Sequence, residues 1–253
     1  MNIDMNGDGG ESFGAYELGN DQELMDSITS INIACGFHAG DPNVMKRTVE
    51  QAIASQTAIG AHPGFQDLAG FGRRMMAVSP EDIYAYILYQ TGALQAFCRA
   101  NGTAISHLKP HGALYHHAAA DEAAAEAVAR AANAMSIQTM FAPPESQLEQ
   151  AADAYGLTVV REAFADRRYE PDGTLMPRTK QGAVLESAEE AAAQAVSIAL
   201  NGEVTASDGS IIRLEAGTIC VHGDSRHAVE SAAAIRQRLE KAGVIVAAPE
   251  AVL

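Results

Sequence analysis

The sequence predicts an α/β protein whose parallel strands form a distorted, TIM-like (β/α) barrel of seven or eight strands. Three observations support this class. Short apolar runs end abruptly in polar, glycine-rich clusters, helical stretches separate the runs, and ionisable residues stand at five of the run ends. In parallel α/β folds the loops that leave the carboxyl ends of the strands form the active site. The pattern therefore predicts an enzyme. An open, doubly wound sheet is the alternative, because periodicity does not show whether a sheet closes.

The expected elements alternate along the whole chain. Strands are expected at residues 3–6, 31–35, 58–61, 104–108, 137–141, 157–160 and 219–221, with 244–247 as a last candidate. Helices are expected at 42–55, 79–100, 118–134, 145–155, 188–200 and 226–242. Asp41-Pro42 and Ser79-Pro80 are typical helix starts, with a capping side chain followed by proline. Because no linker or fixed-period repeat divides the 253 residues, we expect a single barrel domain over 1–253.

Composition excludes several classes of partner. Lys plus Arg is 17 and Asp plus Glu is 32, so the formal charge is −15. This charge repels nucleic acid and anionic lipid surfaces, so neither is an expected partner. The three cysteines form no CxxC pair, which favours a reducing cytoplasm over a disulfide framework. We expect no signal peptide and no membrane span, because no suitable apolar stretch is present.

Two groups of residues at the run ends are candidates for catalysis. Asp8 and Glu11 follow the first run and could share a proton, act as a general base or bind a cation; the alternative is a helix cap with a solvated acid. His38, His62 and His111 follow three other runs, and imidazole acts as acid, base or metal ligand near neutral pH. We expect these three histidines to converge in one pocket, although a single histidine at a strand end is often structural.

Lys109 is the candidate cation of the site. It stands beside Pro110 and His111 at a fourth run end, where its ammonium could hold an oxyanion, a phosphate or a carboxylate. His116 and His117 are expected to be surface residues in the loop before a helix. A divalent metal is also possible, for example on Asp8 and two of the three histidines.

Substrate binding is expected from residues with polar or cationic side chains near these run ends. Asn6 shares the first run with Asp4, and one of the two is expected to point into the barrel. The arginines of two long loops suit bidentate binding of an anion, and His222 with Asp224 could orient a catalytic group or cap a helix. The long segment 163–186 is expected to be a mobile lid. The assigned substrate-binding residues are Asn6, Arg73, Arg74, Arg167, Arg168 and His222.

Seven segments spread over nearly the whole chain together resemble one known family. They are residues 4–14 (DMNGDGGESFG), 32–42 (NIACGFHAGDP), 60–65 (GAHPGF), 70–74 (GFGRR), 109–115 (KPHGALY), 162–169 (EAFADRRY) and 221–224 (VHGD). In these segments the chain resembles the LamB/YcsF family. The resemblance implies a (β/α)7 fold related to glycoside hydrolase and deacetylase barrels.

The resemblance also implies an activity. It is the ATP-dependent hydrolytic opening of 5-oxo-L-proline (pyroglutamate) to L-glutamate by a 5-oxoprolinase, with partner subunits B and C. Because the sequence has no GxxxxGK[ST] loop, we expect ATP, the co-substrate, to be bound by a partner or together with one. Two alternatives stay open: a metal-dependent carbohydrate N-deacetylase, and a non-catalytic binding subunit.

Overall fold

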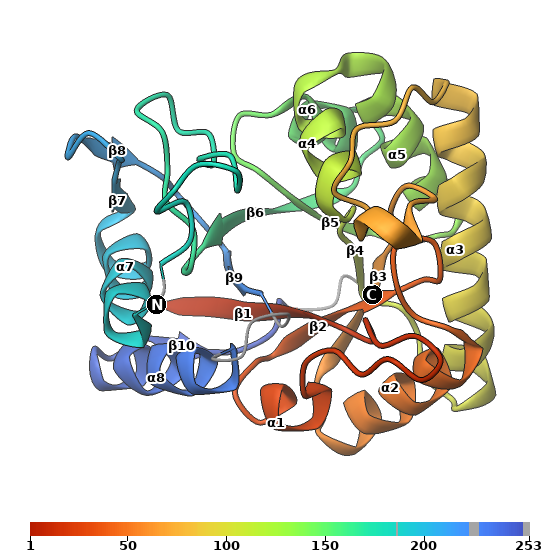
Figure 1. Ribbon diagram of the computed structural model, residues 1–253, viewed down its shortest axis with the longest axis horizontal. Coiled ribbons are helices and arrows are strands. Elements are labelled where there is room, and N and C mark those ends of the chain that lie inside the picture. Colours follow the sequence, from red (N-terminus) through yellow and green to blue (C-terminus); the bar gives the residue numbers. More distant parts are fainter. Residues whose placement is uncertain (186, 223–227, 250–253) are drawn as a thin grey trace.

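A closed barrel of seven parallel strands forms the centre of the computed structural model, which describes residues 1–185, 187–222 and 228–249 (Figure 1). Strand β1 pairs with β2 on one side and with β9 on the other, with Asp4 opposite Thr218. This pairing closes the sheet, so the barrel prediction is confirmed and the open sheet is excluded. The barrel strands are β1 (Asn2–Gly9), β2 (Ser30–Ala34), β3 (Ala58–His62), β4 (His107–Leu108), β5 (Thr139–Ala142), β6 (Thr158–Phe164) and β9 (Thr218–Val221).

Helices surround the barrel on its outside (Figure 1). They are α1 (Asp21–Met25), α2 (Pro42–Ala54), α3 (Pro80–Ala100), α4 (Gly112–Ala120), α5 (Glu122–Ala134), α6 (Gln147–Ala154), α7 (Ala188–Asn201) and α8 (Ala228–Lys241), with a short 3-10 turn η1 (Leu68–Gly70). Strands β7 (Glu203–Thr205) and β8 (Ile211–Arg213) form a hairpin, and β10 (Ile245–Val246) pairs with the first residues of β1. None of the helices in the described part of the chain is both long and apolar enough to cross a bilayer.

Four expected boundaries were wrong. Strand β1 continues through Gly9, so Asp8 lies in the strand and not in the following loop, and β6 continues through Phe164. Strand β4 is only His107–Leu108. The helix expected at 118–134 is two helices, because Asp121 ends α4 and caps α5 by accepting a hydrogen bond from the Ala124 amide. His116 and His117 therefore lie in α4 rather than in a loop.

The interior of the barrel is polar, although branched apolar residues usually fill such barrels. Successive side chains of a strand point to opposite faces, so Asp4, Asn6 and Asp8 of β1 all point inward. The expectation that only one of Asp4 and Asn6 points into the barrel was therefore wrong. Asn32 of β2 donates hydrogen bonds to Asn6 and Asp8. Its neighbours Ile31 and Ile33 are buried within the hydrophobic core. Strand alternation therefore separates an apolar layer beneath the helices from a hydrogen-bonded network inside the barrel.

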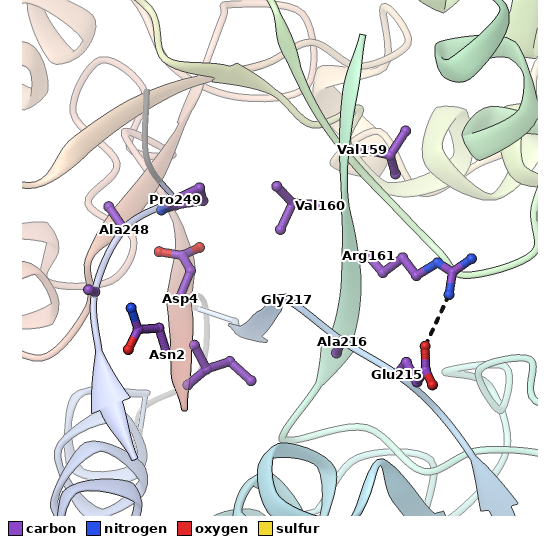
Figure 2. A pocket seen from close by; sticks show the side chains of 12 residues that line it. Asn2, Asp4, Val159, Val160, Arg161, Glu215, Ala216, Gly217, Ala248 and Pro249 are labelled. Atoms are coloured by element: carbon purple, nitrogen blue, oxygen red, sulfur yellow. Dashed lines mark hydrogen bonds and ion pairs between the residues drawn. The ribbon is translucent and has the colours of Figure 1, made fainter. Parts of the chain in front are cut away.

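A cavity of about 510 Å³ opens at the end of the barrel where the strands begin (Figure 2). It is lined by residues of β1 and β6 together with 215–217 and 247–249. An ion pair between Arg161 and Glu215, 3.4 Å long, crosses its edge (Figure 2). The strand-end histidines and Lys109 are absent from its wall, and this end of (β/α) barrels serves stability more than catalysis.

Asp4 in this wall is expected to make stability depend on pH. Burial raises its pKa to about 6 from 3.8, although three hydroxyl groups donate hydrogen bonds to its carboxylate. The folded state therefore keeps this proton longer than the unfolded state, and stability falls as the pH rises from about 4 to about 6. Asp4→Asn removes this titration. Relative to the wild type, the variant should gain about 3 kcal/mol in free energy of unfolding between pH 4 and pH 7, measured by urea denaturation. A difference that does not change with pH would contradict this assignment.

Candidate active site at the carboxyl end of the barrel

A second cavity, of about 520 Å³, lies at the opposite end of the barrel, where the strands finish. Its floor comes from the ends of β1, β3, β4, β6 and β9. Four of these are among the five run ends expected to form the site, whereas β6 takes the place expected for β2. Part of the expected lid segment, from Arg167 to Thr179, completes its wall. The lining residues are Asp8, His62, Arg73, Lys109, Pro110, His111, Gly112, Ala113, Tyr115, His116, Phe164, Arg167, Leu175, Pro177, Arg178, Thr179 and His222.

A buried lysine between two carboxylates forms the floor of this cavity. The Lys109 Nζ atom lies 2.8 Å from Glu162 Oε1 and 3.2 Å from Asp8 Oδ1. It also donates to the Asn6 side-chain oxygen, 3.1 Å away, and contacts the Cys220 sulfur at 3.1 Å. Asp8 and Lys109 therefore meet from different strands. Asn6, which was assigned to substrate binding, lies below them within the barrel and does not line the cavity.

The charges of this group are fixed by mutual attraction. Burial alone would raise the pKa of Asp8, but Lys109 and His62 hold it well below its usual value. Burial alone would lower the pKa of Lys109, but Asp8, Cys220 and Glu162 raise it well above its usual value. At neutral pH the cavity floor therefore presents an ionised carboxylate beside an ammonium group.

The three strand-end histidines converge as predicted, but only His62 and His111 line the cavity, because His38 is fully buried beside them. The rings of His38 and His111 stack in parallel with their centroids 3.6 Å apart, and His62 meets both rings edge-on. His111 Nδ1 lies 3.0 Å from His62 Nε2. Glu11 Oε1 lies 3.3 Å from His38 Nε2 and 3.8 Å from His111 Nδ1. Glu11, His38, His62 and His111 form a buried group that could hold a metal ion.

Two glycines let this cluster pack closely. A Cβ at Gly64 would stand 2.8 Å from His38 Nδ1. A Cβ at Gly72 would lie 2.7 Å from carbon atoms of both His38 and His111, and Gly72 has a positive φ of 63°. Burial, with neighbouring histidines, lowers the pKa of His38 and of His111 well below the usual value. Both rings are therefore neutral at pH 7.

The rim of the cavity is cationic. Arg73, Arg167 and Arg178 all line it. The Arg167 guanidinium donates to the backbone oxygens of Met176, at 2.6 Å, and Ala183, at 3.3 Å, so it also ties these two parts of the loop after β6 together. Burial and the nearby Arg178 lower the pKa of Arg167 to about 10, so this side chain stays charged at neutral pH.

Two arginines expected at the site lie elsewhere. Arg74 forms an ion pair with Asp67, a local contact of the loop after β3. Arg168 donates to the Gly182 backbone oxygen, 3.1 Å away, and borders a different cavity with Gln194 and Val204. His222 does line the site, whereas Asp224 falls outside the described residues. His116 has an exposed side chain on the rim, and His117 is half-buried and does not line the cavity.

Three residues were not among the expected site residues. Glu162 is buried and forms an ion pair with Lys109. The ring centre of Phe164 lies 5.5 Å from Lys109 Nζ. Asp166 accepts a hydrogen bond from His222 Nδ1, 2.9 Å away. The sequence did contain a sign of Glu162's position. The apolar residues Ala163 and Phe164 follow it, which indicates that the strand continues past this charged residue. The Asp166 contact fixes the ring of His222, which stacks on Phe164 with centroids 5.6 Å apart.

Comparisons with known proteins agree on one family. The model of the LamB/YcsF family matches residues 3–253. A protein of Symbiobacterium thermophilum, named as the A subunit of 5-oxoprolinase, is 56% identical over 250 residues, covering 98% of this chain and 96% of the relative. One of Methylococcus capsulatus with the same name is 51% identical, covering 97% and 95%. The crystal structure of the lactam utilization protein from Thermus thermophilus superposes with a TM-score of 0.93 at 45% identity, covering 98% of this chain and 100% of that one.

Proposed function

Because the chain belongs to the LamB/YcsF family, we propose that it is the A subunit of a 5-oxoprolinase and opens the lactam ring of 5-oxo-L-proline. The observation that supports this most is the ionised Asp8 beside the Lys109 ammonium, on the floor of a cavity with a cationic rim. The relatives' names include the word subunit, which supports a multisubunit enzyme. Subunits B and C are the partners in this proposal.

The chemistry divides between a base and a cation. A lactam is a resonance-stabilised amide, so its carbonyl carbon is a poor target for water. In the net reaction the water oxygen bonds to that carbon, the C–N bond breaks, and the nitrogen leaves as the amine of glutamate. Asp8 takes the proton of the attacking water, and Lys109 stabilises the negative charge that develops on the carbonyl oxygen. Asp8 then delivers this proton to the leaving nitrogen, which departs as the amine, and the carboxylate returns to its ionised form.

ATP makes the lactam carbon reactive, because a phosphorylated amide oxygen withdraws electrons from it. In this proposal ATP yields ADP and phosphate, and its binding site lies on a partner or at the junction with one. The sequence supports this division, because it lacks a phosphate-binding GxxxxGK[ST] loop. The three arginines at the rim bind the carboxylate of the substrate and the added phosphate.

Arg178→Gln is expected to weaken substrate binding more than it slows the chemical step. Arg178 is exposed on the rim, where its guanidinium can meet the substrate carboxylate without supporting the fold. We expect KM for 5-oxoproline to rise about tenfold with little change in kcat, consistent with the loss of one charged hydrogen bond. Arg168→Gln is the matched control and should leave KM unchanged. A lower kcat at constant KM for Arg178→Gln would contradict the binding role.

Reconstitution tests the proposed function. The chain is mixed with its candidate B and C subunits, and ADP and glutamate are followed together in the presence of 5-oxoproline. The proposal expects both products in equal amounts, with none when this chain is omitted. Release of acetate from an N-acetyl sugar by the isolated chain without ATP would instead indicate a deacetylase. Full activity after substitution of Asp8 or Lys109 would indicate a non-catalytic subunit.

A further inference from the structure

The protonation states of two histidines follow from the backbone atoms that they contact. His62 Nδ1 lies 2.7 Å from the Lys109 backbone oxygen, and His111 Nε2 lies 2.8 Å from the Phe71 backbone oxygen. A carbonyl oxygen only accepts hydrogen bonds, so both of these ring nitrogens carry a proton. In the neutral rings, His62 Nε2 and His111 Nδ1 therefore carry lone pairs.

These two lone pairs point into the same small space between the His62 and His111 rings. His62 Nε2 and His111 Nδ1 face each other 3.0 Å apart, at the distance of a hydrogen bond, although neither has a proton to donate when the rings are neutral. Two buried lone pairs at this distance repel each other unless a positive group lies against both. A proton added to one ring would meet this need, and so would a bound cation.

The surroundings of the two nitrogens supply further metal ligands. The ligand atoms of Glu11, His38, His62 and His111 all lie within 4.8 Å of one another, and all four residues are buried. The ring nitrogens of His38 make no hydrogen bond with the described residues, and its Nε2 lies 3.3 Å from Glu11 Oε1. A fully buried imidazole with no hydrogen bond is costly unless another group occupies its lone pair.

We propose that Glu11, His38, His62 and His111 bind one divalent transition-metal ion. Three imidazoles and one carboxylate form the kind of donor set that Zn²⁺, Mn²⁺ or Co²⁺ takes in proteins. Two ligand atoms bound at right angles, each about 2.1 Å from an ion, stand about 3 Å apart, which fits the His62–His111 nitrogen pair. The Lys109 and Phe71 carbonyls orient the two rings, as the outer contacts of metal-bound histidines usually do.

A proton explains the cluster less well than a metal does. A proton between His62 and His111 would leave the ring nitrogens of His38 without a hydrogen-bond partner among the described residues. One ion can contact all three imidazoles and the Glu11 carboxylate together. The site differs from the one expected from sequence, because Glu11 rather than Asp8 joins the histidines. Asp8 is instead paired with Lys109.

Metal binding is tested on the isolated full-length chain after treatment with a chelator. Mn²⁺ or Zn²⁺ is titrated by calorimetry, and bound metal is counted by mass spectrometry after gel filtration. We expect one ion per chain and a higher Tm for the loaded protein, because a ligand that binds only the folded state stabilises it. Less than about 0.2 ion per chain at saturating metal, with no change in Tm, would overturn the proposal.

Matched variants locate the ion. Glu11→Gln and His62→Gln should each weaken binding at least about 100-fold, since loss of even an outer contact typically costs 10- to 100-fold. His117→Gln is the control, because His117 lies on α4 outside the cluster, and it should bind metal as the wild type does. Circular dichroism checks the folding of each variant. If His62→Gln does not fold, Glu11→Gln still tests the site, because glutamine has nearly the same shape as glutamate. Wild-type affinity in both cluster variants would overturn the assignment.

The outcome is independent of the proposed reaction. The measurement needs neither 5-oxoproline, ATP nor a partner subunit, so a chain that binds one ion but opens no lactam refutes the function and keeps the site. An active complex whose A subunit binds no ion would support the proposed function and refute the metal site.

Discussion

Replacing Lys109 by methionine is expected to lower turnover of the reconstituted complex about 10²- to 10³-fold, the usual cost of losing a group that stabilises a developing oxyanion. The same change should destabilise the chain. Lys109 is 3% exposed, and its removal leaves the carboxylates of Asp8 and Glu162 buried without their cation. Removing one partner of a buried ion pair costs about 3–5 kcal/mol.

A double variant separates these two effects. In Lys109→Met with Glu162→Gln, one of the two unbalanced carboxylates is also removed, so much of the lost stability should return while turnover stays low. Stability is followed by urea denaturation of the isolated chain, and turnover by glutamate release from the complex. If activity returned together with stability, Lys109 would be a structural residue and its catalytic role would be refuted.

Asp8→Asn should reduce kcat about 10²- to 10⁴-fold, the range for loss of a positioned general base. The amide oxygen can still accept hydrogen bonds from Asn32 and Lys109, so the fold should persist. Because neighbouring charges keep the pKa of Asp8 well below its usual value, the wild-type carboxylate stays ionised in mildly acidic solution. No loss of activity from this residue is expected between pH 7 and pH 5.

Asp153→Asn provides a matched control, since this residue lies exposed on α6 and does not line the cavity. It should show wild-type kcat in the same assay. Near-normal turnover of Asp8→Asn would remove Asp8 from the catalytic residues.

Sequence patterns predicted the parts of the fold that depend on periodicity and on breaks in it. The apolar runs followed by polar clusters correctly placed Asp8, the three histidines and Lys109 at one end of the barrel. The failures came from contacts between residues distant in sequence. Glu162 looked like the end of a strand because a charged residue usually marks one, but Lys109 from another strand neutralises it.

The arginines show a second limit of sequence reasoning. Arg73 and Arg74 are adjacent, yet only Arg73 reaches the cavity, because Asp67 binds its neighbour. Adjacent side chains in a loop point in different directions. The Gly70 amide donates a hydrogen bond to the Asp67 carboxylate, and this places the carboxylate where Arg74 binds it, away from the cavity. Likewise the pairing of Glu11 with the histidines depends on the path of the loop after β1.

The pairing of β1 with β9 has a consequence for how the molecule is made. The Thr218 hydroxyl donates a hydrogen bond to the Asp4 carboxylate, although the two residues are 214 apart in the sequence. Strand β9 therefore completes a sheet that β1 began. Until β9 emerges during synthesis, β1 and β6 each present an unpaired edge, and the polar interior lacks the Thr218 hydroxyl and Cys220. Closing such a long loop is entropically slow, and open edges invite association with other chains. The nascent protein is therefore vulnerable to aggregation until β9 has emerged and paired with β1 and β6.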